Sequence, residues 1–308
     1  MYFDKVPNTT LADYVKAKYT GTQGENNLYL HDSTLTNGAG DGSYRYAGSS
    51  DTTNNFVCFG YDSTDGTCPT DYLYRIIGVF GDQVKLIKYD YAKASLLGTD
   101  GDYVKTYPSG TYNGTNKGQN SFADIGVYNW NIKSGIVNNT WSNSLLNKTN
   151  LNTNYINNIG TNWSNKIATH TWKVGGNTDA NLYVVTVSNT YKNEITNPVT
   201  NRTYDAKVGL MYVSDYGYAA APSAWTTIVS SYNSSSITSV NWMYMGLLEW
   251  TITPSTSQTT TVAYIYANGG VSTFGAANDY AVRPVLYLES SVAYVGGNGT
   301  ASSPFLIK

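Results

Sequence analysis

Two histidines limit the acid–base chemistry that this 308-residue chain could perform. A Ser–His–Asp or Cys–His site needs a histidine held between a nucleophile and a carboxylate. His31 lies in a loop-rich N-terminal stretch and His170 in a strand-like one, and no nucleophile motif accompanies either residue. We therefore interpret both as structural or surface histidines, and we expect the protein not to be an enzyme.

The two cysteines, Cys58 and Cys68, enclose the turn-rich segment 59–67, which can bring its own ends together. We predict a disulfide between them, of the kind that persists in oxidising compartments. Closing so short a loop stabilises a fold by about 2–3 kcal/mol in the chain-entropy model. A zinc or redox pair is the weaker alternative, because the C-x9-C spacing lacks the close pairing and the further ligands of such sites.

Aspartates in glycine-containing loops are the best candidates for metal ligands. Asp62 and Asp65 form one such pair, and Asp100 and Asp102 form another. Calcium takes six to eight oxygen ligands, but neither pair has the spacing of a calcium loop or a nearby glutamate that could bind through both oxygens. We interpret these residues as turn formers and expect neither a metal nor a cofactor.

Aromatic residues crowd the last third of the chain among Asn, Ser and Thr. The group consists of Trp225, Trp242, Tyr244, Trp250, Tyr264 and Tyr266. Most should be core, because a chain poor in Leu and Ile has to pack with aromatics. Polar loops rich in tyrosine also form adaptable binding surfaces, so we expect one or two members of the group to be exposed.

Charge and composition exclude several classes of protein. The chain has 19 Lys and Arg against 21 Asp and Glu, a net charge of −2, so it offers no basic field for nucleic acid or for an anionic membrane. Aromatic residues make up 14% of the chain, which argues against disorder. The abundant Gly and Tyr, 29 of each, are weak helix formers and argue against a helix bundle.

Periodic patterns predict the elements that would hold these residues. Apolar residues at helical spacing predict a helix over 11–19 with Thr10 as its cap. Residues 73–80 and 83–89, joined by Gly81-Asp82, predict a hairpin with a type II′ turn. Short helices are expected near 140–146 and 155–167. Further strands are expected at 28–31, 43–46, 56–59, 182–187, 207–213, 250–253, 261–266 and 281–288. Because Pro284 cannot donate to a ladder, we expect the last strand to be an edge strand or to carry a bulge.

Several phrases occur in an order that is typical of one bacterial family. They are the stretches 73–80, 209–219, 250–254, 282–288 and 296–305. Residues 73–308 thereby resemble an uncharacterised domain family of Gram-positive bacterial surface proteins, related to the C-type-lectin-like fold that formylglycine-generating enzymes also use. The resemblance implies an α+β, mostly β, fold: a C-type-lectin-like domain at 72–308 with few short helices and long loops, after a small loop-rich region with one helix at 1–71.

The resemblance also implies several details. The strand 73–80 should pair with 282–288. Formylglycine-generating enzymes use a pair of cysteines late in the domain, whereas Cys58 and Cys68 precede it, and the calcium motif of sugar-binding C-type lectins is missing. Relatives often carry a prepilin-like or other hydrophobic N-terminal helix. Since the chain starts at Met1 without the features of a signal peptide, we expect a native anchor or signal to be missing from it.

The fold implied by the resemblance gathers its long loops at one end, here the stretches 219–248 and 268–280. The expected ligand-binding residues are Trp225, Trp242, Tyr244, Asn268, Phe274, Asn278, Asp279 and Tyr280. An exposed aromatic among them could stack on a sugar ring or fill a pocket of a partner. Asn268-Gly269 is equally typical of a hairpin turn. Burial of both tryptophans would remove the expected anchors and favour a structural role.

These observations predict an extracellular or cell-surface protein, adhesin-like and non-catalytic, that binds an unknown glycan or protein ligand. The alternative is a structural subunit of a pilus-like filament, because low charge and exposed aromatic area also favour self-association. A relative of the formylglycine-type enzymes is a weaker alternative.

Overall fold

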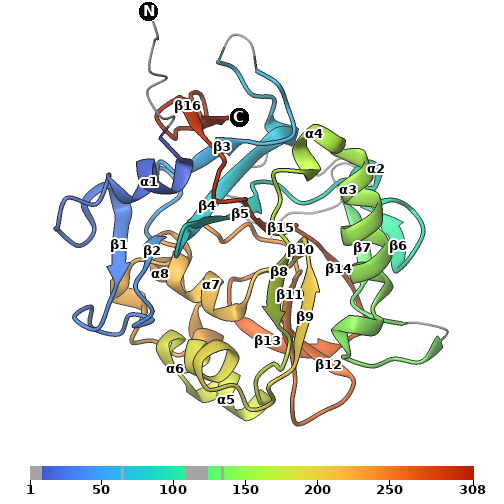
Figure 1. Ribbon diagram of the computed structural model, residues 1–308. Helices are drawn as coiled ribbons and strands as arrows, with labels where there is room; N and C mark the ends of the chain where they lie inside the picture. Colours follow the sequence, from blue (N-terminus) through green and yellow to red (C-terminus); the bar gives the residue numbers. More distant parts are fainter. Residues whose placement is uncertain (1–8, 64–65, 108–123, 133–134) are drawn as a thin grey trace, which may run out of the picture.

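The computed structural model describes residues 9–63, 66–107, 124–132 and 135–308 of the chain (Figure 1). Strands account for 30% of the residues and helices for 25%, so the fold is α+β with more strand than helix, as the sequence predicts. In the described residues no helix is long and apolar enough to cross a membrane.

Most strands belong to two large sheets, and two small sheets complete the set. The strands are β1 (Leu28–His31), β2 (Ser43–Tyr46), β3 (Phe56–Cys58), β4 (Leu73–Phe80), β5 (Gln83–Lys88), β6 (Tyr103–Thr106), β7 (Gly126–Asn129), β8 (His170–Lys173), β9 (Thr203–Ala206), β10 (Val208–Gly209), β11 (Glu249–Pro254), β12 (Thr261–Ile265), β13 (Val271–Gly275), β14 (Asp279–Ala281), β15 (Val285–Tyr287), β16 (Tyr294–Gly296) and β17 (Leu306–Ile307).

The helices are short. The α-helices are α1 (Leu11–Lys16), α2 (Ala94–Leu97), α3 (Ile156–Asn158), α4 (Thr161–Ser164), α5 (Asp179–Val184), α6 (Val187–Tyr191), α7 (Val213–Ala219) and α8 (Ser235–Thr238). Single 3-10 turns occur at Glu25–Asn27, Thr70–Tyr72, Trp141–Asn143, Pro222–Ala224 and Val229–Ser231, and π-helical turns at Leu146–Tyr155 and Lys192–Thr196.

The first large sheet has the order β1-β2-β4-β5-β15-β10, with β3 also paired to β4. Its centre is the predicted hairpin, in which Phe80 pairs with Gln83 across the two-residue loop. Gly81 has a φ of +62° and Asp82 has no positive φ, as a type II′ turn requires. The strand 285–287 pairs with β5 and not with β4, so the pairing implied by the resemblance is wrong: β5 lies between the two strands.

The N-terminal region is part of this sheet. The helix predicted over 11–19 is confirmed as α1, which ends earlier, at Lys16, and the Thr10 side chain accepts a hydrogen bond from the backbone N–H of Asp13. β2 pairs with the second half of β4, and β3 pairs with its first half. The boundary expected between residues 71 and 72 therefore falls within one hydrogen-bonded sheet, and the blue N-terminal elements lie beside β4 (Figure 1).

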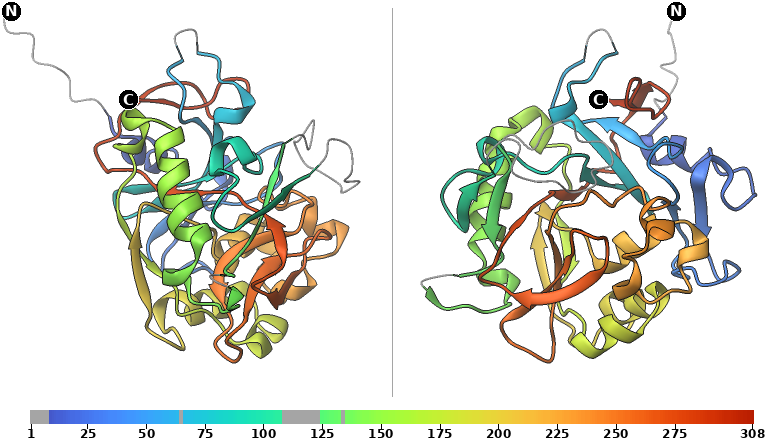
Figure 2. Two further views of the ribbon diagram at one scale, coloured as in Figure 1. Left: turned by 90° about the vertical axis from the view of Figure 1, so that its right-hand side faces the viewer. Right: turned by 180° about the vertical axis from the view of Figure 1, so that it is seen from behind.

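The second large sheet has the order β13-β12-β11-β14-β7-β6, with β11 and β14 parallel. The chain passes from this sheet to the first one through three residues between β14 and β15, which include Pro284 (Figures 1 and 2). The expectation of one continuous strand over 281–288 is wrong. Pro284 lies between two strands that belong to different sheets, which explains how a residue without an N–H is accommodated.

One other predicted strand is wrong, and a second is shorter than predicted. Most of the stretch 182–187 is helical, and the Thr178 side chain caps α5 by accepting from the backbone N–H of Asn181. Of the stretch 207–213 only Val208 and Gly209 form a strand, β10, and α7 begins at Val213. The Asp215 carboxylate accepts from the backbone N–H of Tyr212 at the start of α7. β-Branched residues favour strands, but both stretches adjoin capped helices.

Aromatic residues fill the core. All seven tryptophans are buried, and six of them are less than 2% exposed. Each of Trp130, Trp172 and Trp250 donates its indole N–H to a backbone carbonyl, which satisfies the polar end of a buried ring. Aromatic packing therefore replaces the aliphatic core that this composition cannot supply.

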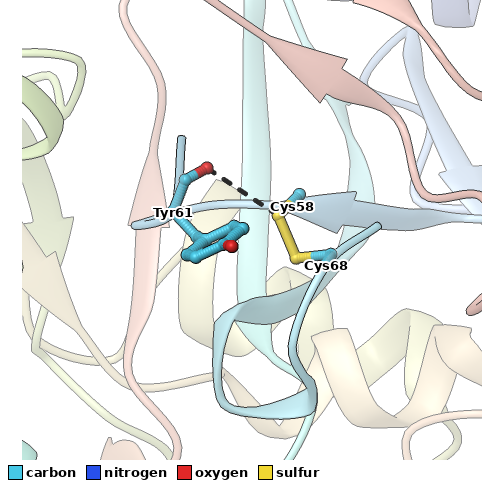
Figure 3. Close-up of a disulfide and its surroundings, with 3 residues drawn as sticks. All are labelled: Cys58, Tyr61 and Cys68. Atoms are coloured by element: carbon cyan, nitrogen blue, oxygen red, sulfur yellow. Dashed lines mark hydrogen bonds between the residues drawn. A yellow bond between two sulfur atoms is a disulfide. The ribbon is translucent and has the colours of Figure 1, made fainter. Parts of the chain in front are cut away.

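The predicted disulfide is confirmed. Cys58 at the end of β3 is bonded to Cys68, and the two Cα atoms lie 5.8 Å apart (Figure 3). The carbonyl oxygen of Tyr61 lies 3.9 Å from the sulfur of Cys58, so the turn folds back over the bond. The bond connects the end of β3 to the segment that leads into β4.

Candidate functional site

The two tryptophans named as candidate ligand-binding residues are core residues. Trp225 is 0% exposed and Trp242 is 1% exposed. The indole N–H of Trp225 donates to the carbonyl of Ala220, and that of Trp242 donates to the carbonyl of Tyr46, each at 2.8 Å. Both rings are held inside because the loop stretch 219–248 folds against the sheets and does not project into solvent.

Tyr244 and Tyr280 are also buried, at 5% and 6% exposure. The hydroxyl of Tyr244 donates to the carbonyl of Ala267 at 2.7 Å. The ring of Tyr280 lies 4.4 Å from the ring of Trp250 and 4.8 Å from that of Tyr264, measured between centroids. These residues support a surface but do not offer a free aromatic ring.

Phe274 is the exception among the expected aromatic residues, at 51% exposure. It lies on β13, the edge strand, opposite Val262 of β12. Tyr266, which follows β12, is 47% exposed, so one of the six grouped aromatics is exposed, as expected. Side chains alternate along a strand, so Phe274, Ser272 and their partners on β12 project to one side of the hairpin.

Helix α5 adds a third exposed ring to this side of the hairpin. The hydroxyl of Tyr183, which is 41% exposed, lies 3.0 Å from the Ser272 hydroxyl and accepts from the backbone N–H of Thr273 at 3.3 Å. α5 lies beside β13 in Figure 1. We call the exposed rings of Tyr183, Tyr266 and Phe274 the aromatic face. The sequence did not reveal Tyr183, because the segment that carries it was predicted to be a strand.

Hydrogen bonds also set the acidity of the Tyr183 hydroxyl in the aromatic face. Partial burial raises the pKa of Tyr183, but hydrogen bonds from Ser272 and Thr273 to its oxygen outweigh burial, so the pKa is lower than usual. The hydroxyl is thus held in one orientation at the rim of the face. This arrangement suits recognition of hydroxyl-rich ligands, in which fixed donors and acceptors surround an exposed ring.

The polar residues expected at the site mostly organise turns. The Asn268 side-chain oxygen accepts from the backbone N–H of Gly270, and Gly269 has a φ of +96°, so the hairpin-turn alternative is confirmed. The Asn278 amide donates to the carbonyl of Gly275 at 2.8 Å. Asp279 forms an ion pair with Lys105 at 2.7 Å. Of these groups only Asn268 belongs to the β12–β13 hairpin that carries Tyr266 and Phe274, whereas the ion pair joins β14 to β6 at the other edge of the sheet.

A second concentration of polar side chains lies inside the molecule, between the first sheet and α7. The ammonium group of Lys85 lies 2.6 Å from a carboxylate oxygen of Asp215, and both side chains are at most 2% exposed. Arg45 lies 3.9 Å from the other Asp215 oxygen and 2.6 Å from Asp41. We call Arg45, Lys85, Glu194 and Asp215 the buried ionic cluster. Sequence reasoning missed this cluster; its only signal was a lysine on a strand whose two faces are buried.

Glu194 completes the buried ionic cluster. Its carboxylate accepts from the backbone N–H groups of Val213 and Ser214 and from the Thr253 hydroxyl. Burial raises its pKa to about 7, although these hydrogen bonds oppose the shift. A cavity of about 260 Å³ is lined by Arg45, Lys85 and Asp215 of the cluster, together with His170 and Tyr287. The cluster contains both an amine and carboxyl groups removed from water.

The two histidines have structural surroundings. His31 is fully buried, and its Nδ1 accepts from the backbone N–H of Ala39 at 3.0 Å. Burial holds its pKa well below the usual value. The ring of His170 stacks on that of Tyr287 at 3.7 Å, and burial lowers the pKa of His170 to about 4. Both residues are positioned as neutral packing partners.

The described residues contain no group of three or more His, Cys, Asp or Glu side chains placed to hold a metal ion. Asp65 lies outside the described residues. Asp102 is buried, and its carboxylate accepts from the backbone N–H groups of Leu146 and Ile132. It therefore organises a loop, as turn-forming aspartates do.

Comparisons with protein-family models, with curated proteins and with solved structures find nothing that matches this chain.

Proposed function

We propose that this chain is an extracellular, surface-displayed and non-catalytic binding protein, adhesin-like, on a C-type-lectin-like scaffold, and that its ligand is a glycan. The observation that carries the proposal is the aromatic face. Three large rings, Tyr183, Tyr266 and Phe274, are 41 to 51% exposed around one edge hairpin. Exposed large apolar side chains grouped in this way mark interaction sites.

A glycan fits this surface better than an apolar partner. Sugar rings have apolar faces that stack on aromatic rings and hydroxyls that need hydrogen-bond partners. Beside the rings lie Ser272, Thr273 and Asn268, which are at least partly exposed. The rings stand on a hydrogen-bonded hairpin, so little conformational entropy is lost on binding.

Two further features support the proposed location and the absence of catalysis. The Cys58–Cys68 disulfide is of a kind that persists outside the reducing cytosol. His31 is fully buried, and the ring of the half-buried His170 stacks on that of Tyr287. A third feature supports the proposed scaffold. The late strand 285–287 and the early strand 73–80 belong to one sheet, in which β5 lies between them.

A pilus-like filament subunit is the second candidate. The burial of Trp225 and Trp242 removes two expected ligand anchors and favours this candidate. The edge strand β13 could also receive a strand from another copy. Against strand addition, the Tyr183 hydroxyl occupies the N–H of Thr273 at that edge. Association of copies would bury the same aromatic face that we assign to a glycan.

The test is a glycan array probed with fluorescently labelled protein, followed by titration of the best glycan. We expect Tyr266→Ala and Phe274→Ala each to weaken binding by about 5- to 30-fold, which corresponds to about 1–2 kcal/mol. Val199→Ala is the matched control, because Val199 is also 51% exposed but lies outside the face. Absence of glycan binding, or equal affinity for all variants, would refute the proposal. Long ordered fibres in electron microscopy that Phe274→Ala abolishes would support the filament instead.

A further inference from the structure

The buried ionic cluster holds an amine and a carboxyl group in contact, beside a cavity that both side chains line. Lys85 of β5 and Asp215 of α7 are separated by 130 positions in the sequence, yet Nζ of Lys85 lies 2.6 Å from Oδ2 of Asp215. Their side chains are 1% and 2% exposed. The carboxyl carbon is bonded to this oxygen, and reacting atoms in near-attack arrangements lie about 3–3.5 Å apart.

We propose that Lys85 and Asp215 join in an intramolecular amide bond, a covalent cross-link between β5 and the start of α7. The Lys85 Nζ–Asp215 Cγ bond forms, and the Cγ–Oδ2 bond of Asp215 breaks. The Lys85 ammonium group first gives one proton to the Asp215 carboxylate. When the amide bond forms, the amine nitrogen loses a second hydrogen, and both hydrogens leave with Oδ2 as water. No oxidant, reductant or further reactant is needed.

Burial favours the neutral form of the Lys85 amine, because a charge is costly in low-dielectric surroundings. The rings of Tyr212 and Tyr287, whose centres lie 4.6 and 5.2 Å from the Lys85 nitrogen, oppose this effect by stabilising the ammonium form. Burial lowers the pKa of Lys85, although Asp215 opposes this shift. A neutral amine facing a protonated carboxyl group is the pair that amide formation requires.

Neighbouring groups can stabilise the reaction. Arg45 lies 3.9 Å from Oδ1, the Asp215 oxygen that remains as the amide carbonyl and carries negative charge in the tetrahedral intermediate. Oδ2 also accepts from the backbone N–H of Tyr212 at 2.9 Å, which fixes the carboxyl plane. The Glu194 carboxyl interacts electrostatically with both reactants.

A covalent link would remove the main cost of this cluster. Holding an ion pair in an apolar interior costs desolvation energy that pairing only partly returns. An amide carries no charge, so its formation relieves that cost. It would also close a loop of 130 residues around the first sheet and α7, adding to the ten-residue loop closed by the disulfide. The inference does not depend on which ligand the aromatic face binds.

Intact-mass spectrometry of the purified full chain tests the proposal. We expect a mass about 18 Da below that of the disulfide-bonded sequence, the mass of one water. Peptide mapping should yield a branched peptide that contains both Lys85 and Asp215. A folded sample, identified by a cooperative thermal transition, that shows the full mass would overturn the proposal. This result would leave the glycan proposal untouched, because that proposal is tested by binding alone.

Two variants separate the cross-link from other losses of water. Succinimide formation at Asp-Gly sequences also removes water, but hydroxylamine cleaves succinimides and leaves an amide intact. Lys85→Arg keeps the positive charge without an amine nucleophile and should restore the full mass. Lys88→Arg, which changes another buried lysine of the same strand, should keep the deficit. A deficit that persists in Lys85→Arg refutes the cross-link, and if this variant does not fold, the branched peptide of the wild type decides.

Discussion

Replacing Trp242 by alanine tests whether the loop stretch 219–248 belongs to the core or to a binding surface. The ring is 1% exposed, its N–H donates to the carbonyl of Tyr46, and the guanidinium group of Arg75 lies 4.7 Å from its centre. Large-to-small substitution of a buried Trp costs about 3–5 kcal/mol. The carbonyl of Tyr46 would also lose its indole donor, which adds about 1 kcal/mol if no water replaces it.

The assay is urea denaturation followed by tryptophan fluorescence and circular dichroism. We expect the free energy of unfolding to fall by about 4–6 kcal/mol in Trp242→Ala. In Trp242→Phe, which keeps most of the ring but not the N–H, it should fall by about 1–2 kcal/mol. Phe274→Ala, at an exposed position, is the control and should change it by less than about 1 kcal/mol.

A loss below about 1.5 kcal/mol in Trp242→Ala would refute the reasoning, because it would mean that the site collapses or that the ring is exposed in solution. Glycan affinity gives an independent readout. Trp242→Phe should bind like the wild type, since the ring lies beneath the surface and contacts no ligand. A loss of affinity in this variant without a loss of stability would return Trp242 to the binding surface.

Four further outcomes are expected. Replacing Cys58 and Cys68 together by serine should lower the free energy of unfolding by about 2–3 kcal/mol, and an unchanged urea midpoint would contradict this value. Arg283→Met should lower the free energy of unfolding by about 3–5 kcal/mol, because it leaves the buried Glu249 carboxylate without the guanidinium that binds it at 2.7 and 2.9 Å. The double variant Arg283→Met with Glu249→Leu should recover most of this loss. A double variant as unstable as the single one would argue against the pair. Folding lowers the pKa of His170 from 6.5 to about 4, so the unfolded chain binds more protons between these pH values. The free energy of unfolding should therefore rise with pH over that range. His170→Gln should show a shallower rise, and equal slopes in the two proteins would contradict the burial of the ring. Treatment with EDTA should leave the melting temperature unchanged, and a drop of several degrees that calcium reverses would reveal a structural ion.

Local signals in the sequence were sufficient for several elements. Gly81-Asp82 specified the central hairpin, because a type II′ turn needs a positive φ that glycine adopts easily. Thr10 specified the start of α1 by capping. The spacing of Cys58 and Cys68 made their bond possible, since the turn between them returns on itself. In each case the interacting groups are close in sequence, so the chain needs no other partner to define the structure.

Tertiary structure decided which aromatics are exposed. Trp225, Trp242 and Phe274 lie in similar polar stretches of the sequence, yet only Phe274 reaches the surface. Its strand is the last of its sheet, whereas the tryptophans are covered by segments from elsewhere in the chain. Whether a side chain is buried depends on which segments pack over it, and the local sequence around the residue does not show this.

The contact between Lys85 and Asp215 shows the same limit most clearly. From the sequence, Lys85 is one charged residue in an alternating strand, and Asp215 is one acidic residue before a tyrosine. Folding brings them together over 130 positions and removes them from water. The residue types supplied the amine and the carboxyl group, but only the packing of β5 against α7 placed them in contact, because that contact depends on the register of a sheet that the whole chain builds.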